Sequence, residues 1–236
     1  TEIYTLSLHD ALPICEVESE AFERTNHTQS LNSPINSIIT FQTKKNNTDL
    51  VPQPTILIFG EKRKKRLLDQ YAVGLCLAGY KVIQILVSLV KNPTQSWFQQ
   101  INAELQANQI PLKPKKMILF QNIGPIILPL IKELGIKSQT ILVAPHWKNL
   151  AINKETVHNQ ENIQLIFPLD LPQSDLHSIQ DFIELNKIPQ ENIAPFTSGG
   201  FDLHQQETVV LARLIFWLEN ENSALQNASN KRAEKM

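Results

Sequence analysis

An aspartate and a histidine lie in turns of the chain where they could act together on a substrate. Asp170 lies in the turn after an apolar run at residues 163–167, and His204 lies in the turn after a shorter run at residues 192–197. A histidine oriented by a carboxylate can take a proton from a hydroxyl group or from water. The two residues therefore indicate general acid–base chemistry, if the fold brings the two turns together.

The turn best suited to carry a nucleophile for this pair lacks one. An apolar run at residues 117–120 leads into a tight turn at residues 121–124, and residues 126–134 have helical spacing. A strand, a sharp turn and a helix in this order expose the side chain at the centre of the turn. Asn122 occupies that centre, and its carboxamide is not an ionisable nucleophile.

Other polar residues narrow the chemistry further. His146 and Trp147 follow an apolar run at residues 140–144 and could line a pocket. The histidines lack the spacing of a metal site, and the chain has neither a G-x-G-x-x-G nor a Walker-type phosphate loop, so we expect no metal and no cofactor. We interpret the basic residues 62–66 as a solvated loop and first helical turn rather than an anion or nucleic-acid patch, because the formal net charge of the chain is only −1.

The chain alternates between apolar runs of strand length and amphipathic runs of helix length. We expect strands at residues 35–43, 54–60, 81–90, 117–120, 140–144, 163–167 and 192–197. We expect helices at residues 67–78, 93–108, 126–134, 175–185 and 208–218, with Gly79 ending the first and Ser174 capping the fourth. An antiparallel entry strand and regular alternation after it predict an α/β fold, a three-layer α/β/α sandwich with a mostly parallel sheet. Ligand sites in such sheets lie at the carboxyl ends of the strands.

The order and lengths of these elements resemble the α/β-hydrolase fold over about residues 35–218. The resemblance also rests on the short strand that ends in Gly60, on the Gly-Tyr-Lys-Val step at residues 79–82, and on glycine-containing turns at corresponding places. It implies a single domain whose site lies at the carboxyl ends of the parallel strands.

The resemblance assigns the turn after residues 117–120 to the nucleophile elbow, where α/β-hydrolases carry a serine in the motif G-x-S-x-G. Phe120 and Asn122 stand at the positions of the first glycine and the serine, and only Gly124 is kept. Glu61 and Ile123 stand at the two positions whose backbone N–H groups would form the oxyanion hole. The resemblance thus implies an elbow that is degenerate at its nucleophile.

The resemblance also implies roles at the last two strands. The acid that orients the histidine would be Asp170, with Asp175 as the second choice. The glycine-containing loop at residues 198–204 would carry the histidine itself. By register Phe201 occupies that position, and His204 follows three residues later.

Composition and chain ends set the remaining limits. Residues 1–14 resemble the in-frame translation of a sequencing adaptor, and we exclude them from fold reasoning. We expect loop or disorder at residues 15–34, one domain at residues 35–219, and a polar tail at residues 220–236.

An adaptor would replace the natural N-terminus, so the compartment is unknown and cytoplasmic only by default. The net charge and the absence of an apolar run of about 20 residues give no reason to expect a nucleic-acid partner or a membrane span.

Three functional hypotheses follow. We prefer a hydrolase-fold protein that lacks serine chemistry and acts as a binding or scaffold module for a small acyl or ester-like ligand or a protein partner. The alternative is an esterase-like hydrolase of small acyl substrates that uses His204 and Asp170 with Ser198 or water as nucleophile. A Rossmann-like nucleotide enzyme is disfavoured by the missing glycine fingerprint. Whether the chain is an enzyme stays open at this point.

Overall fold

The computed structural model of the protein describes residues 22–28, 33–43, 53–90, 94–110, 116–133, 139–146, 163–197, 203 and 206–219. Residues 1–14 and the polar tail lie outside this part of the chain. The strands of the described part are β1 (Phe22–Thr28), β2 (Ile35–Thr43), β3 (Thr55–Glu61), β4 (Lys81–Val87), β5 (Lys116–Phe120), β6 (Gln139–Val143), β7 (Ile163–Pro168) and β8 (Ile193–Phe196). The helices are η3 (Lys62–Lys64), α1 (Lys65–Leu77), α2 (Gln95–Ala107), α3 (Ile123–Glu133), α4 (Gln173–Asn186), η5 (Gln190–Asn192) and a C-terminal helix at residues 207–219.

These strands form one sheet in the order β1-β2-β4-β3-β5-β6-β7-β8. β2 pairs antiparallel with both β1 and β4, and every later pairing is parallel. The predicted antiparallel entry strand and mostly parallel sheet are therefore confirmed. The central parallel strands read as continuous apolar runs because helices cover both of their faces.

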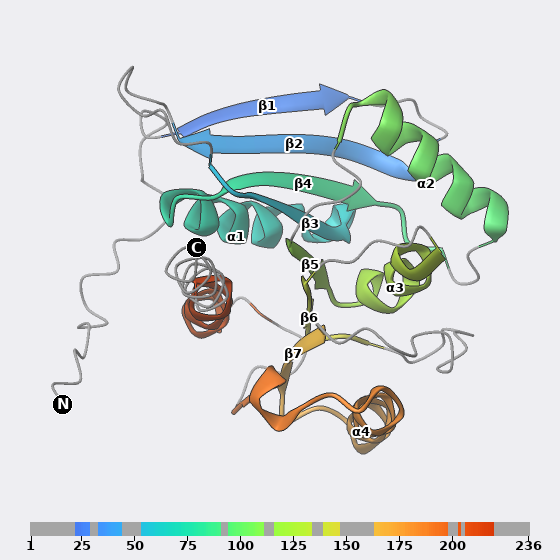
Figure 1. The fold of residues 1–236 in the computed structure, drawn as a ribbon, viewed down its shortest axis with the longest axis vertical. Helices are drawn as coiled ribbons and strands as arrows, with labels where there is room; N and C mark the ends of the chain where they lie inside the picture. The colour runs from blue at the N-terminus through green and yellow to red at the C-terminus, as the bar shows by residue number, and fades with distance from the viewer. Residues whose placement is uncertain are drawn as a thin grey trace, which may run out of the picture.

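Two hydrophobic cores flank the sheet. α1 and the C-terminal helix pack on one face, and α2, α3 and α4 pack on the other (Figure 1). This is the predicted three-layer sandwich. Lys116, buried at the start of β5, donates a hydrogen bond from its ammonium to the carbonyl of Leu218 and so ties the end of the C-terminal helix to the sheet. No helix in the described part of the chain is long and apolar enough to cross a bilayer.

Gly79 ends α1 as predicted. Its φ of 93° lies in the left-handed region, its N–H donates to the carbonyl of Cys76 at 3.0 Å, and the N–H of Tyr80 donates to the carbonyl of Leu75 at 3.1 Å. This pair of hydrogen bonds is the Schellman motif, which glycine favours because it lacks a Cβ. The helix is therefore stopped by its own backbone geometry.

Lys187 ends α4 with the same geometry but without glycine. Its φ is 50°, and the N–H of Ile188 donates to the carbonyl of Ile183 at 3.1 Å. We expect Lys187→Gly to stabilise the fold by about 0.5–1 kcal/mol, because it removes the left-handed strain of a residue with a Cβ. The measurement is the urea midpoint. Gly79→Ala is the matched control and should lower the midpoint through conformation alone, since a Cβ there meets nothing within 4 Å.

One strand lies where a loop was expected. Within residues 15–34, which we expected to be loop or disorder, the structure has β1 (Phe22–Thr28). Residues 23–26 are exposed, so the segment shows no apolar periodicity from which a strand could be predicted. Its backbone pairs with β2 along the whole strand, and Phe22 packs 6.2 Å from the Phe41 ring. Backbone pairing and side-chain contacts with the rest of the fold, rather than composition, form the strand.

The expected cap of α4 is also wrong. α4 begins at Gln173, so its N-cap is Pro172 and Ser174 lies inside the first turn. The carbonyl of Ser174 accepts a hydrogen bond from the Ser178 hydroxyl at 3.0 Å. The N–H groups of Asp175 and Leu176 both donate to the carbonyl of Pro172, which closes the first turn without a side-chain cap.

Cys76 is a buried free thiol in the core between α1 and the sheet. Burial raises the pKa of Cys76 from its ordinary value of 9.0 to about 11. In a Cys15→Ser background we therefore expect the native protein at pH 8 to react with a disulfide reagent about a hundredfold more slowly than a free cysteine, because the thiolate is scarce. Addition of urea should bring the rate to that of a free thiol. Fast labelling without urea would contradict the burial.

Candidate functional site

The turn between β5 and α3 is the sharp elbow that the sequence predicted. Gln121 has a φ of 48°, its N–H donates to the carbonyl of Val143 at 2.8 Å, and its carbonyl accepts from the N–H of Gly124 at 3.2 Å. The residue with strained backbone is therefore Gln121, one position before Asn122. Left-handed strain at a non-glycine residue often marks a functional turn. Both residues carry an uncharged carboxamide, so neither is an ionisable nucleophile.

Gly124 allows α3 to start close against the sheet. A Cβ at this position would lie 3.3 Å from Leu142 Cδ2, closer than most Cβ atoms come to a neighbour, and 3.6 Å from Leu119 Cβ, an ordinary contact. Ile123, the first residue of α3, is fully buried beside it. The one glycine of the motif that the sequence keeps thus has a packing role.

Glu61 and Asn122 meet at the neighbouring strand ends. The Asn122 Nδ2 group donates to Glu61 Oε1 at 2.6 Å. Glu61, the last residue of β3, is only 4% exposed, and its other oxygen pairs with Arg63. The sequence singled out Glu61 for its backbone N–H, whereas here its carboxylate occupies the elbow. The signal that sequence reasoning passed over was an acidic residue directly at the end of a buried strand.

A cleft of about 550 Å³ opens beside this pair, at the carboxyl ends of β3 and β4. Its lining combines two cations with apolar and hydroxyl groups: Glu61, Lys62, Arg63, Val87, Ser88 and Leu89. Lys62 and Arg63 belong to the basic run that we interpreted as a solvated loop. The structure places both at the cleft, where ligands of parallel sheets bind.

A histidine and a buried aspartate meet at the next strand ends. His146 follows β6, and its Nε2 lies 3.4 Å from Oδ1 of Asp175 in the first turn of α4. Asp175 is 3% exposed, and His146 is half-buried. An aspartate in the first helical turn is also favoured by the helix dipole. His146, which we predicted to line a pocket, thus has a carboxylate partner. That partner is Asp175, the second choice for the acid that orients a histidine.

The other predicted site residues are Asp170, in an exposed turn, and three that lie outside the described residues. Asp170 is exposed in the turn after β7, where the N–H of Leu169 donates to the carbonyl of Phe196 at 2.8 Å. His204, Phe201 and Trp147 lie outside the described residues. The pairing of His204 with Asp170 therefore stays a prediction.

Four polar side chains form a row across the carboxyl ends of neighbouring strands. Glu61, Asn122 and His146 lie at or just after the ends of β3, β5 and β6, and Asp175 lies in the first turn of α4, the helix that follows β7; these strands are neighbours in this order. Such a row can accept and donate hydrogen bonds to a small ligand. In the part of the chain that the structure describes, no group of three or more histidine, cysteine or acidic residues could hold a metal ion.

No family model and no curated protein sequence matches the chain. Solved structures do match. A predicted CIB-like hydrolase from Thermoplasma acidophilum aligns with a TM-score of 0.59 at 12% identity, over 84% of this chain and 99% of that one. An alpha-beta serine hydrolase homologue from Coxiella burnetii aligns with a TM-score of 0.59 at 12% identity, over 83% and 97%. A carboxylesterase from Lactobacillus plantarum aligns with a TM-score of 0.51 at 11% identity, over 85% and 98%. At these identities the likeness concerns the fold alone, and the chain has the α/β-hydrolase fold.

Proposed function

We propose that the protein binds a small acyl or ester-like ligand beside the elbow and does not carry out serine-hydrolase chemistry. The observation that supports this most directly is the hydrogen bond of 2.6 Å between Asn122 and the buried Glu61 carboxylate. This hydrogen bond engages the amide N–H of Asn122, the residue at the nucleophile position. It also brings the negative charge of Glu61 to a place where acyl transfer needs hydrogen-bond donors.

A comparison of two interaction energies supports the absence of serine-hydrolase chemistry. One oxyanion-hole donor contributes roughly 3–4 kcal/mol to an acyl-transfer transition state. Two like charges about 4 Å apart repel by roughly 4 kcal/mol at an effective dielectric constant near 20. An oxyanion within about 4 Å of the Glu61 carboxylate would meet a repulsion of this size, which would offset one donor. Arg63 reduces this repulsion but is itself mostly exposed, so solvent screens it.

The cleft suits a ligand with an apolar body and a polar acyl group. Leu89 is 42% exposed and forms part of an apolar wall together with Val87. Ser88 Oγ accepts a hydrogen bond from Asn36 Nδ2 at 2.7 Å, so the hydroxyl proton can turn toward a ligand carbonyl. Arg63 offers N–H donors at the rim.

A second candidate function is an esterase-like hydrolase with a rearranged site. The specific observation in its favour is the pair of His146 and Asp175, since a histidine beside a buried carboxylate can act as a general base toward water. In the sequence-based version of this candidate, His204 and Asp170 form the pair. The two versions differ in the histidine that ester hydrolysis would require, His146 or His204.

The test is turnover of short-chain p-nitrophenyl esters by the full chain and by His146→Ala, His204→Ala and Asn122→Ala. We expect no turnover above background in any of the four. Turnover that either histidine variant abolishes would favour the second candidate.

Binding is tested separately with p-nitrobutyranilide, an amide that resists hydrolysis. Leu89→Asp should weaken binding at the cleft, whereas Leu77→Asp, which alters an exposed leucine at the end of α1, should not. Absence of saturable binding would contradict the proposed ligand class even if turnover is also absent.

A further inference from the structure

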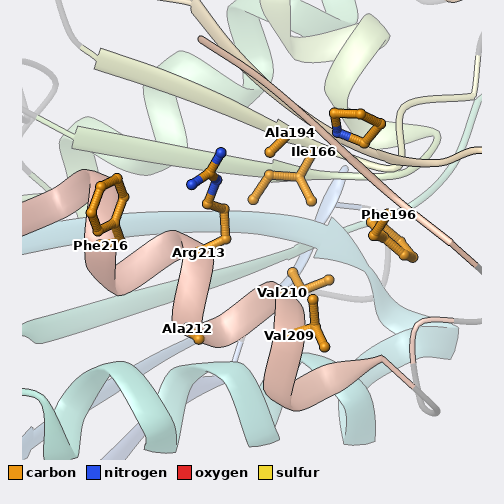
Figure 2. Close-up of a pocket in the computed structure, with 9 residues that line it drawn as sticks. Ile166, Ala194, Phe196, Val209, Val210, Ala212, Arg213 and Phe216 are labelled. Atoms are coloured by element: carbon orange, nitrogen blue, oxygen red, sulfur yellow. The ribbon is translucent and has the colours of Figure 1, made fainter. Parts of the chain in front are cut away.

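A second cavity lies away from the elbow, between the C-terminal helix and the last two strands (Figure 2). Its volume is about 380 Å³, within the range of roughly 300–1,000 Å³ that is usual for small-ligand sites. The strand wall is apolar and includes Ile166, Ala194 and Phe196. Val209 and Phe216, on the helix wall, are each about half exposed, so the groove opens to the surface.

Among the described residues that line this groove, Arg213 alone is charged. Its guanidinium stacks over the rings of Phe216 at 5.4 Å and Trp217 at 5.0 Å. Figure 2 shows the side chain extending from the helix toward Ile166 and Ala194. Stacking uses the faces of the guanidinium and leaves its N–H edge available for a planar anion. Among the described residues, no carboxylate pairs with Arg213.

From this arrangement we infer that the groove binds an aliphatic monocarboxylate, with the chain along the apolar wall and the carboxylate on Arg213. The inference goes beyond the proposed function and uses none of its residues. Burial of the ligand's aliphatic chain contributes affinity but does not fix how the ligand is oriented. A bidentate pair between the guanidinium and the carboxylate fixes that orientation.

A peptide added as a further strand fits the groove less well. β8 is the outermost strand, and its exposed Pro195 has no N–H to donate to a neighbouring strand. The cavity is walled by strand side chains and by the C-terminal helix, and at the edge of the sheet its lining includes Pro195, which offers no N–H to a ligand backbone. These features favour a small amphipathic ligand over an added strand.

The experiment is titration calorimetry of the full chain with sodium decanoate below its micelle concentration. We expect saturable binding of one ligand, with affinity rising up to about fourfold per methylene from hexanoate to decanoate. Arg213→Gln should weaken decanoate binding roughly tenfold and leave binding of decan-1-ol unchanged. Ala212→Trp, at an exposed groove position, should abolish binding of both ligands.

Arg66→Gln is the matched control, because it removes an exposed arginine from α1 at no groove position. It should leave decanoate affinity unchanged. Equal losses in the two arginine variants, or no saturable binding at all, would overturn the inference. So would loss of binding in Leu89→Asp instead of Arg213→Gln, which would assign the ligand to the cleft beside the elbow. A dimer that Ala212→Trp dissociates would assign the groove to a second copy of the chain.

Discussion

Phe120→Gly, which restores the first glycine of the elbow motif, is expected to destabilise the protein by at least 3–5 kcal/mol, the usual cost of truncating a buried phenylalanine. Phe120 is 2% exposed, and its ring lies 4.9 Å from that of Tyr71 on α1. The side chain fills the core between α1 and the sheet, so its removal leaves a cavity that the paired strand cannot close. Glycine adds a further conformational penalty in a strand.

Urea unfolding followed by circular dichroism measures this effect. Phe98→Ala is the control, because Phe98 is only partly buried on α2 and should cost less. If Phe120→Gly proved as stable as the natural chain, the elbow would have room for glycine and Phe120 would not be a core residue. No ester turnover is expected from this variant in either case.

Trp217→Ala is expected to cost about 3–5 kcal/mol, whereas Phe216→Ala, the next residue along the chain, should lie within about 0.5 kcal/mol of the natural protein. Trp217 is 5% exposed and packs in the core under the C-terminal helix, while Phe216 is 52% exposed. The two residues are adjacent, of similar size and in the same helix, so the comparison isolates burial from composition and helix propensity.

Thermal unfolding of both variants tests the orientation of this helix. A loss of several kcal/mol shifts the midpoint by roughly 2–4 °C per kcal/mol in a domain of this size. Equal losses for the two variants would mean that the helix does not present Trp217 to the sheet as described. Since both residues also stack on Arg213, the same variants should reduce decanoate binding if the groove has the proposed role.

The parallel core was predictable because its residues obey a strong physical constraint. Strands buried on both faces, such as β5 and β6, are apolar beyond their first one or two residues, and this leaves a clear pattern. β1 obeys no such constraint, because an edge strand needs only backbone pairing on one side. The cap at Ser174 was misassigned because the carbonyl of Pro172 closes the turn, and carbonyls carry no sequence signal.

The sequence predicts where the candidate site lies but not which of its side chains interact. The carboxyl ends of the strands follow from topology, and Glu61, Asn122 and His146 were singled out on that ground. Which side chains pair depends on the turns that connect these ends. The contact of His146 with Asp175 joins β6 to α4, and no spacing in the sequence encodes a pairing between separate loops. The left-handed residue of the elbow is Gln121, one position before Asn122, and a difference of one residue is below the precision of boundary prediction.

β1 also has a consequence for how the protein behaves in concentrated solution. An open sheet offers its outermost strand as a template on which a strand of another molecule can grow, and this is a route to fibrils. Here that strand exposes residues 23–26, and Arg24 is held by Asp69 at 3.3 Å and stacks on Phe41. A second molecule that paired with this edge would have to desolvate Glu23, which accepts a hydrogen bond from Gln42, and Arg24, which pairs with Asp69. We therefore expect the charged residues of β1 to disfavour association through this edge.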